Sequence, residues 1–386
     1  MTTKPEAGPE DRAVSPFDTR CMSRALALAR RGRGKTAPNP LVGAVAAKQN
    51  RIIGEGWHRQ YGGPHAEAEA LDAALAAGET TEGADLYCTL EPCCFTAPDK
   101  HQDPCTKRII AGKIRRVFIA NQDPNPKVNG GGIRALEEAG IHVVQGLLAA
   151  EGERLNQGFF TFQRLGRPFV RLKIAQSLDG RIACAGGDAR WITDEAARRA
   201  VHRMRRAHDA VLIGRGTALA DDPELTVRLV KGANPLRAVL DSRLSLPASS
   251  RILRLPEPEK TLIFCVEKDY NREKACRLRE QGAAVIPLGE LSLPGVLAAL
   301  AAQGARSVLV EGGAAVFTSF LKAGLWDRIA VFTAPLMLGQ GISWAGDLGI
   351  SAVKDAIRLE DVLIKRIGQQ VLLDARRKAP APGSRG

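Results

Sequence analysis

Four residues of this chain have the types and the spacing of a zinc-dependent hydrolytic site. His65 and Glu67 form a His-x-Glu pair, and two thiols follow at Cys93 and Cys105. One imidazole and two thiolates suit a four-coordinate Zn²⁺ whose fourth position stays open for a water, which the metal makes more acidic. Glu67, two residues past the first ligand, can then move a proton. The pattern predicts hydrolytic deamination at an amidine-like ring carbon.

A structural zinc site is the alternative, because such a site has four protein ligands. The fourth ligand could come from His58, Cys94 or His101. Cys94 directly follows Cys93 and cannot easily share its direction, so a small core residue is the simpler interpretation. The other thiols have no partner motif and are predicted to be core residues: Cys21, Cys88, Cys184, Cys265 and Cys276.

The composition is that of an ordinary globular protein. The chain has 386 residues, of which 45% are apolar and 25% are charged, so it can hold two or three domains with a core in each. Collagen, a coiled coil and a mostly disordered chain are excluded. The eight cysteines are scattered, which favours reduced thiols in the cytoplasm over a disulfide scaffold. We expect neither a secretory signal nor a membrane span.

The formal net charge is +13. A positive field of this size favours anionic ligands such as nucleic acid, phosphorylated metabolites or dinucleotide cofactors. Solubility alone is the plain alternative. Part of the excess lies in a C-terminal segment with the composition of a solvated tail, which contains Arg376, Arg377, Lys378 and Arg385.

Strands alternate with helices along the first half, which is typical of a layered α/β domain. Helices are predicted over residues 20–31, 66–77, 106–111 and 132–139, and strands over 41–47, 84–89, 116–120 and 141–144. His65 then precedes a helix, and Cys93 follows a strand. A polar connector over residues 151–167 ends this half, so the first domain is predicted to span residues 16–150.

The alternation restarts at Phe169 and predicts a second α/β domain over residues 168–376. Strands are predicted over 169–175, 210–214, 237–240, 261–266, 307–311 and 327–333, and helices over 194–204, 293–302 and 314–323. Gly312 and Gly313 stand at a strand-to-helix turn, where glycines let the backbone approach a phosphate. The Gly-x-Gly-x-x-Gly pattern of an ordinary Rossmann domain is absent from the sequence.

The first half carries five motifs in the order found in a known family. They are T-A-P-N-P-L-V-G over residues 36–43, G-E-G-W-H over 54–58, P-H-A-E over 64–67, T-L-E-P-C over 89–93 and D-P-N-P over 123–126. This half resembles the deaminase half of the bifunctional deaminase/reductases of riboflavin biosynthesis, with a cytidine-deaminase-like three-layer fold. The resemblance implies zinc at His65, Cys93 and Cys105, Glu67 as proton donor and a substrate contact by Asn39. A turn residue is the plain alternative for Asn39, which stands between two prolines.

The segment between Cys93 and Cys105 departs from that family. The family reads Pro-Cys-Ser-His-His-Gly-Arg-Thr-Pro-Pro-Cys, whereas this chain lacks the His-Gly-Arg-Thr core and has a longer loop. Zinc binding tolerates a change of loop length because both ends stay anchored. Lys100 or His101 could replace the arginine, but substrate contacts from the loop do not carry over. A chain that keeps only reductase activity is therefore one alternative.

The second half resembles the reductase half of the same family over about residues 169–373, with a dihydrofolate-reductase-like fold and NADPH as cofactor. The motifs are K-I-A-Q-S-L-D-G-R over residues 173–181, W-I-T over 191–193, G-R-G-T over 214–217, A-D-D-P-E-L-T-V-R over 220–228 and V-E-G-G-A over 310–314. The resemblance implies NADPH at Ala175, Trp191, Thr217, Asp221, Ser242 and Gly313. It implies substrate at Ala189, Arg205, Leu225, Arg228 and Glu311.

These positions suit a phosphorylated ribose. Arg205 and Arg228 supply guanidinium groups, which can grip a phosphate at two points. Ala189 stands where relatives have a substrate-contacting side chain, so any contact there must come from the backbone. Hydride transfer requires the nicotinamide to be held against an open-chain aldehyde or imine carbon with water excluded. No proton donor is assigned. A solvated helix face is predicted for Arg198, Arg199 and Arg206, which match no family position.

The resulting hypothesis is a bifunctional cytoplasmic enzyme. It would deaminate 2,5-diamino-6-(5-phosphoribosylamino)pyrimidin-4-one with zinc, then reduce the ribosyl side chain of 5-amino-6-(5-phosphoribosylamino)uracil to ribityl with NADPH. Its partners would be phosphorylated small molecules, without nucleic acid or membrane, and the family suggests a homo-oligomer. One rival is a nucleic-acid base deaminase with an accessory domain, although aromatic residues make up only 5% and no basic stripe is interleaved with them. The other is a structural zinc module fused to a nucleotide sensor.

Overall fold

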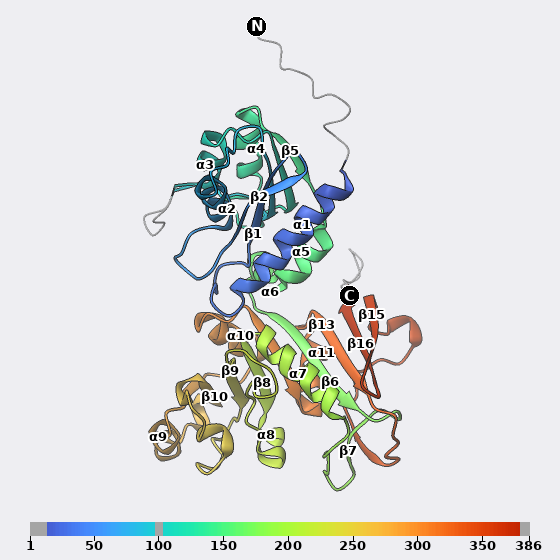
Figure 1. Ribbon diagram of the computed structural model, residues 1–386. Coiled ribbons are helices and arrows are strands. Elements are labelled where there is room, and N and C mark those ends of the chain that lie inside the picture. Colours follow the sequence, from blue (N-terminus) through green and yellow to red (C-terminus); the bar gives the residue numbers. More distant parts are fainter. Residues whose placement is uncertain (1–13, 97–102, 379–386) are drawn as a thin grey trace. The chain divides into compact units, whose positions relative to one another are not determined.

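The computed structural model describes residues 14–96 and 103–378. The chain divides into two compact units, of which the first ends at Gly166 and the second begins at Arg167 (Figure 1). Each unit has helices packed on a β-sheet, so the predicted α/β class is confirmed for both halves. Within the described ranges, no helix has the length and apolar character needed to cross a membrane.

The first unit is a five-stranded sheet between two layers of helices. Its order is β2-β1-β3-β4-β5, with bounds Arg51–Trp57, Gly43–Lys48, Asp85–Leu90, Arg116–Asn121 and His142–Gln145. Strand β1 is antiparallel to β2 and β3, whereas β3, β4 and β5 are parallel. One face packs on α1 (Pro16–Ala29) and α5 (Ala149–Leu155), and the other on α2 (Ala66–Ala76), α3 (Cys105–Ala111) and α4 (Gly131–Glu138) (Figure 1). This is the predicted three-layer arrangement.

Glycines in β2 let helix α2 lie unusually close to the sheet. A Cβ atom added at Gly54 would lie 2.1 Å from the carbonyl oxygen of Ala70, and one added at Gly56 would lie 2.3 Å from that of Ala66. Strand β2 was not predicted, because glycine is normally depleted in strands. Here the missing side chains position the first turn of α2, directly after His65.

The polar connector packs with the first unit. It forms α5 and α6 (Gln157–Leu165), and Leu155 contacts the core beside α1. Asn156 pairs with the backbone of Leu41, accepting from its N–H at 2.8 Å and donating to its carbonyl oxygen at 2.8 Å. The bounds 16–150 and 168–376 remain predictions of where the two catalytic halves lie.

The second unit is built on a nine-stranded sheet with the order β11-β10-β9-β8-β12-β6-β13-β16-β15. The strands, in that order, are Ala284–Leu288, Thr261–Val266, Leu236–Leu240, Ala210–Gly214, Ser307–Gly312, Phe169–Gln176, Arg328–Thr333, Gln370–Arg377 and Leu359–Ile367. The strands from β11 to β13 are parallel, and β16 and β15 are antiparallel additions at one edge. A separate pair joins β7 (Arg181–Cys184) to β14 (Gly341–Ser343).

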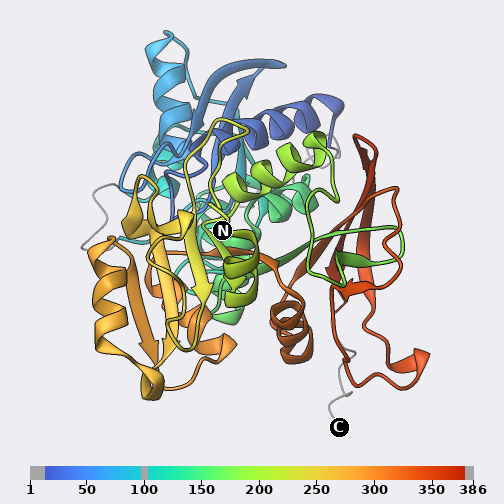
Figure 2. The ribbon, with the colours of Figure 1, turned by 90° about the horizontal axis from the view of Figure 1, so that it is seen from below.

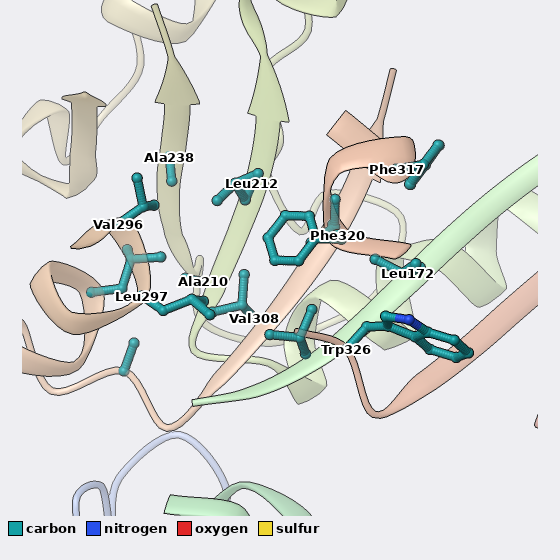
Figure 3. Close-up of a cluster of buried hydrophobic side chains, with 14 of the residues drawn as sticks. Leu172, Ala210, Leu212, Ala238, Val296, Leu297, Val308, Phe317, Phe320 and Trp326 are labelled. Atoms are coloured by element: carbon teal, nitrogen blue, oxygen red, sulfur yellow. The ribbon is translucent and has the colours of Figure 1, made fainter. Parts of the chain in front are cut away.

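Helices cover both faces of this sheet. On one face lie α10 (Leu293–Ala302) and α11 (Ala314–Ala323), and on the other lie α7 (Glu195–Ala207), α8 (Arg215–Asp221) and α9 (Arg272–Glu280). Short 3₁₀ helices of the second unit occupy Arg251–Leu253, Pro258–Lys260, Glu267–Asp269 and Val353–Asp355, and one in the first unit occupies Arg30–Gly32. Val308 lies in one core cluster with Phe317, Phe320 and Trp326 (Figure 3). Val310 belongs to the same cluster, whereas Leu309 between the two valines belongs to the core on the opposite face. Since both faces are buried, the parallel strands are nearly continuous apolar runs.

Strands β15 and β16 form one edge of the nine-stranded sheet (red in Figures 1 and 2). Neither of these two strands was predicted from the sequence. Among the described residues, β15 pairs with β16 and has no strand on its other side. The pairing slips between Glu360 and Leu363. Most of β15 is exposed, so its sequence lacks the alternation of a half-buried strand.

Candidate functional site

His65, Cys93 and Cys105 converge at one face of the first unit. The His65 Nδ1 atom lies 3.2 Å from the Cys105 sulfur and 3.5 Å from the Cys93 sulfur. Adjacent ligands of a tetrahedral zinc ion are about 3.3–3.8 Å apart, given the usual Zn–N and Zn–S bond lengths. These three residues are also the candidate metal-ligand group that the described residues contain. The donor set therefore fits zinc in both chemistry and spacing.

The two thiols come from different elements that meet at this face. Cys93 follows strand β3, and Cys105 begins helix α3 and donates its backbone N–H to the Cys93 sulfur at 3.4 Å. The hydrogen bond from the Cys105 side chain and the imidazole of His65 lower the pKa of Cys93 to about 3, despite its burial. A thiol with so low a pKa is present as thiolate, which is the form that binds metal.

Glu67 is buried in the first turn of α2, beside the ligand group and outside it. Burial raises the pKa of its carboxyl group, and the nearby Cys93 raises it further. A raised pKa makes the carboxylate a stronger proton acceptor than an exposed glutamate. The position and the electrostatics of Glu67 suit a proton shuttle.

Glu91 anchors the loop that carries Cys93. Its buried carboxylate accepts hydrogen bonds from three backbone N–H groups at the start of α4, at 2.9 to 3.2 Å, and from the N–H of Asp123 at 3.1 Å. A carboxylate at a helix N-terminus is favoured by the helix dipole. The T-L-E-P-C and D-P-N-P motifs are therefore joined in space by Glu91.

Asn39 lies next to His58 beside the metal-ligand group. His58 is buried, its Nδ1 atom lies 2.9 Å from the Pro64 carbonyl oxygen, and its Nε2 atom lies 3.2 Å from the Asn39 amide nitrogen. The rings of His58 and His65 are 5.7 Å apart. Both ring nitrogens of His58 have partners, so it is not a fourth zinc ligand here. Of the other two candidates for a fourth ligand, Cys94 does not belong to the candidate metal-ligand group, and His101 lies outside the described residues.

The altered loop falls largely outside the described residues. The structure describes residues up to 96 and again from 103, so Lys100 and His101 cannot be placed. Their proposed role as a substitute for the family arginine stays a prediction.

Four predicted NADPH residues stand at the carboxyl ends of neighbouring parallel strands. Ala175 lies at the end of β6, Thr217 follows β8, Ser242 follows β9 and Gly313 follows β12. These strands are adjacent in the order β9-β8-β12-β6. Ligands of open α/β sheets bind at this edge. A Cβ atom at Gly313 would lie 3.0 Å from the Thr217 hydroxyl, so the glycine lets two of these segments meet.

Glu311, at the end of β12, is the centre of a charged cluster. Arg205 of α7 forms two hydrogen bonds to its carboxylate, at 2.6 and 2.8 Å. Burial alone would raise the pKa of Glu311, but the Arg205 cation and its hydrogen bonds lower it to about 2. Lys173 and Arg228 interact electrostatically with the same carboxylate. Three predicted substrate residues therefore lie together, although long stretches of sequence separate them.

Two known sequence families match the chain in this order. Residues 15–121 match the cytidine and deoxycytidylate deaminase zinc-binding region, and residues 168–373 match the RibD C-terminal domain. The riboflavin biosynthesis protein RibD of Aquifex aeolicus is 40% identical over 361 residues, which cover 93% of this chain and 98% of that protein. The chain belongs to the RibD family. The RibD protein of Bacillus amyloliquefaciens is 44% identical over 359 residues, covering 92% and 95% of the two chains.

Solved structures of RibD proteins share the whole fold. A diaminohydroxyphosphoribosylaminopyrimidine deaminase/5-amino-6-(5-phosphoribosylamino)uracil reductase from Thermotoga maritima is 37% identical, with a TM-score of 0.82 over 94% of this chain and 99% of that one. RibD of Acinetobacter baumannii is 36% identical, with a TM-score of 0.82 and the same coverage. The chain is thus a two-part RibD enzyme of riboflavin biosynthesis, with a deaminase half and a reductase half.

Two residues of the RibD reductase half were not singled out from the sequence. Lys173 is the first residue of the K-I-A-Q-S-L-D-G-R motif. It interacts electrostatically with Glu311 and Asp221, and burial lowers the pKa of its ammonium group. His202, on α7, is buried and accepts two hydrogen bonds from the backbone at residues 228 and 229. A clue was available for His202, because it lies three residues before Arg205 and therefore on the same helix face.

The remaining predicted sites differ in exposure. Trp191 is 68% exposed, with the Arg198 guanidinium 4.6 Å from its ring centre. The Leu225 side chain is buried in the core, so this residue can offer only its backbone to a ligand. Asp221 is half-buried, and burial raises the pKa of its carboxyl group. Ala189 is partly exposed two residues before Trp191.

Proposed function

We propose that the first unit removes an amino group from 2,5-diamino-6-(5-phosphoribosylamino)pyrimidin-4-one by hydrolysis. We propose that the second unit reduces the ribosyl side chain of 5-amino-6-(5-phosphoribosylamino)uracil to ribityl with NADPH. The observation that carries this proposal is the convergence of His65, Cys93 and Cys105 beside a buried Glu67, in a chain whose second half matches the RibD C-terminal domain. The similar protein from Thermotoga maritima is described as a deaminase and reductase of these compounds.

In the deaminase half, Glu67 moves the protons. Zinc, when held by the imidazole and the two thiolates, supplies a Lewis acid that activates a water. Glu67 accepts a proton from that water and gives it to the leaving amine, so that ammonia departs and a carbonyl replaces the amino group. Its raised pKa supports both steps, because a carboxyl group that titrates nearer to neutral pH exchanges protons more readily.

Asn39 orients the pyrimidine in this proposal. Since Nδ1 of His58 faces a carbonyl oxygen, that atom carries the proton, and Nε2 accepts from the Asn39 amide. The hydrogen bond leaves the Asn39 carbonyl oxygen and its second N–H for a ligand. Such an amide matches the alternating donors and acceptors along the edge of a diaminopyrimidinone.

In the reductase half, NADPH would lie along the carboxyl ends of β9, β8, β12 and β6, with Trp191 and Asp221 beside it. The cofactor supplies the hydride. Arg228 binds the ribose phosphate, because its side chain is 51% exposed while Arg205 is largely occupied by Glu311. Glu311 is ionised and therefore accepts hydrogen bonds from the substrate instead of donating a proton.

Lys173 is the group in this cluster suited to donate a proton. Burial lowers the pKa of its ammonium, although the Glu311 carboxylate opposes that shift. An ammonium whose pKa is lowered gives up its proton more readily. We assign Lys173 as donor to the nitrogen or oxygen that becomes negative when hydride adds to C1 of the open ribose.

Ammonia release from the diaminopyrimidine substrate, measured first without NADPH and then with it, tests the two halves. The proposal expects ammonia in both cases and NADPH oxidation after deamination. A protein that oxidises NADPH only on the pre-deaminated substrate would be the reductase-only alternative, and the loop after Cys93 would be the place to look. Salt-sensitive RNA binding with base deamination would favour the nucleic-acid alternative.

We also propose that two copies associate through the edge of the second unit. Among the exposed large apolar side chains of the described residues, ten of nineteen lie between residues 337 and 371. Strand β15 carries Glu360 and Asp361 near one end and Lys365 and Arg366 near the other, so antiparallel contact with a second copy brings opposite charges together. Ile364→Lys should convert a dimer to a monomer in sedimentation experiments. An unchanged mass would contradict this interface.

A cytoplasmic location of the protein stays a prediction.

A further inference from the structure

Helix α7 presents two polar side chains toward the segment that carries Arg228. His202 and Arg205 are three residues apart and share a helix face. Arg205 donates to the Thr226 carbonyl oxygen at 3.0 Å. The His202 Nδ1 atom accepts from the backbone N–H of Arg228 at 3.0 Å and of Leu229 at 3.3 Å.

This segment depends on side chains for its position. Residues 223–228 belong to no helix or strand, so no sheet ladder or helical turn satisfies their backbone. Besides the bonds from α7, the Asn234 side-chain oxygen accepts from the N–H of Val227 at 2.9 Å. His202 therefore supplies the acceptor for the N–H groups of residue 228 and its successor.

The imidazole can do this only in one form. A backbone N–H is always a donor, so Nδ1 must be unprotonated and the ring proton must lie on Nε2. Burial, followed by the Arg205 and Arg228 cations, lowers the pKa of His202 to about 4. The ring is thus held neutral, and a protonated ring would place a third donor against two others.

We infer that His202 is a positioning residue of the reductase half: its Nδ1 atom fixes the backbone at Arg228 and so places the guanidinium that binds the substrate phosphate. This inference rests on the proposed role of Arg228. Arg205 holds the Thr226 carbonyl oxygen and the Glu311 carboxylate at once, so α7 ties the segment of the phosphate-binding arginine to the carboxylate at the centre of the cluster. His202 touches neither substrate nor cofactor in this assignment.

Two substitutions separate the hydrogen bond from the volume of the ring. His202→Asn keeps an acceptor, because the asparagine carbonyl oxygen occupies nearly the same place as Nδ1. His202→Leu has a similar volume and no acceptor. Steady-state NADPH oxidation on 5-amino-6-(5-phosphoribosylamino)uracil gives the KM for each substrate and kcat. We expect about a tenfold higher substrate KM in His202→Leu, an unchanged NADPH KM, and values near those of the unsubstituted protein in His202→Asn.

The inference would be overturned in favour of a structural role if kcat and both KM values worsened together in His202→Leu while its melting temperature fell. Equal defects in His202→Leu and His202→Asn would overturn it as well. A second measurement uses the double variant His202→Leu/Arg228→Ala. If His202 acts through Arg228, this variant is no worse than Arg228→Ala alone; additive losses would contradict the inference. Failure of the proposed function itself is distinguishable, because the unsubstituted protein would then not oxidise NADPH on this substrate.

Discussion

Arg205 and Glu311 form a two-point ion pair inside the second unit, with side chains that are 11% and 7% exposed. The guanidinium also reaches the backbone carbonyl of Thr226. An arginine that the family resemblance assigns to substrate is therefore used to hold a carboxylate and a loop. Arg228 is more exposed, and its guanidinium lies 3.3 Å from the Glu224 carboxylate, so the proposed anionic ligand would compete with a partly exposed ion pair.

Breaking this pair should destabilise the second unit. Arg205→Met leaves Glu311 buried without its partner, and removing one member of a buried pair costs about 3–5 kcal/mol. Thermal unfolding should show the loss, and NADPH oxidation should fall while ammonia release persists. Arg205→Met/Glu311→Gln should recover part of the stability, since an amide is cheaper to bury than a charge. A double variant no more stable than Arg205→Met would contradict this account.

The same pair predicts how stability depends on pH. The pKa of Glu311 is lowered from 4.5 to about 2 in the folded protein. A lowered pKa contributes stability that is complete above pH 4.5 and is lost as pH falls toward 2. The shift corresponds to about 3 kcal/mol. Denaturant unfolding of the second unit between pH 3 and pH 7 should show part of this loss on acidification, and Glu311→Gln should lack that part of the pH dependence.

Glu67→Gln should abolish ammonia release and leave zinc bound. General acid–base catalysis contributes about 10²–10⁴-fold, and the amide cannot exchange the proton. Metal analysis and NADPH oxidation on the deaminated substrate should be unchanged. Glu69→Gln, on the same helix and paired with Arg59 at 2.8 Å, is the matched control. Loss of zinc in Glu67→Gln would show that the carboxylate holds the site together.

Removal of a metal ligand should separate the two activities. Cys105→Ser replaces a soft thiolate by a poor zinc ligand, so zinc content and ammonia release should both fall. The reductase should keep its rate on deaminated substrate. Cys276→Ser is the control, because that thiol is exposed and lies in the other unit. Zinc retained at full occupancy in Cys105→Ser would remove this residue from the ligand set.

Gly56→Ala should disturb the zinc site from outside it. The new Cβ atom would lie 2.3 Å from the Ala66 carbonyl oxygen, so α2 must move away from the sheet. Such overpacking costs about 1–3 kcal/mol, and the shift should reduce zinc affinity because His65 leads into α2. Gly289→Ala, where a Cβ atom meets nothing within 4 Å, should change neither stability nor zinc content. Equal behaviour of the two variants would exclude close packing as the reason for Gly56.

Some elements were predictable because their signals are local. The helix predicted over residues 66–77 is α2, and the strand predicted over 84–89 is β3, each within a residue of its observed bounds. Strand β2 was missed, because its glycines serve a contact with α2 that no local pattern contains. Strand β15 was missed because it is mostly exposed and has no buried face to impose alternation. Strand β16 was also missed, although Leu372 and Ala375 on it are buried, because its buried positions include the polar residues Gln370 and Asp374.

The sequence by itself predicted the chemistry of the candidate zinc site, because it contains the ligand types in the expected order, with a predicted strand and a predicted helix beside them. The family motifs likewise pointed to Arg205 and Glu311. The tertiary structure decided what these residues do to one another. Parallel strands bring their carboxyl ends to one edge, so residues far apart in sequence meet there. Helix α7 packs beside this edge and adds Arg205, which pairs with Glu311 of β12, and His202, which accepts from the Arg228 backbone. Lys173 of β6 interacts with the same Glu311.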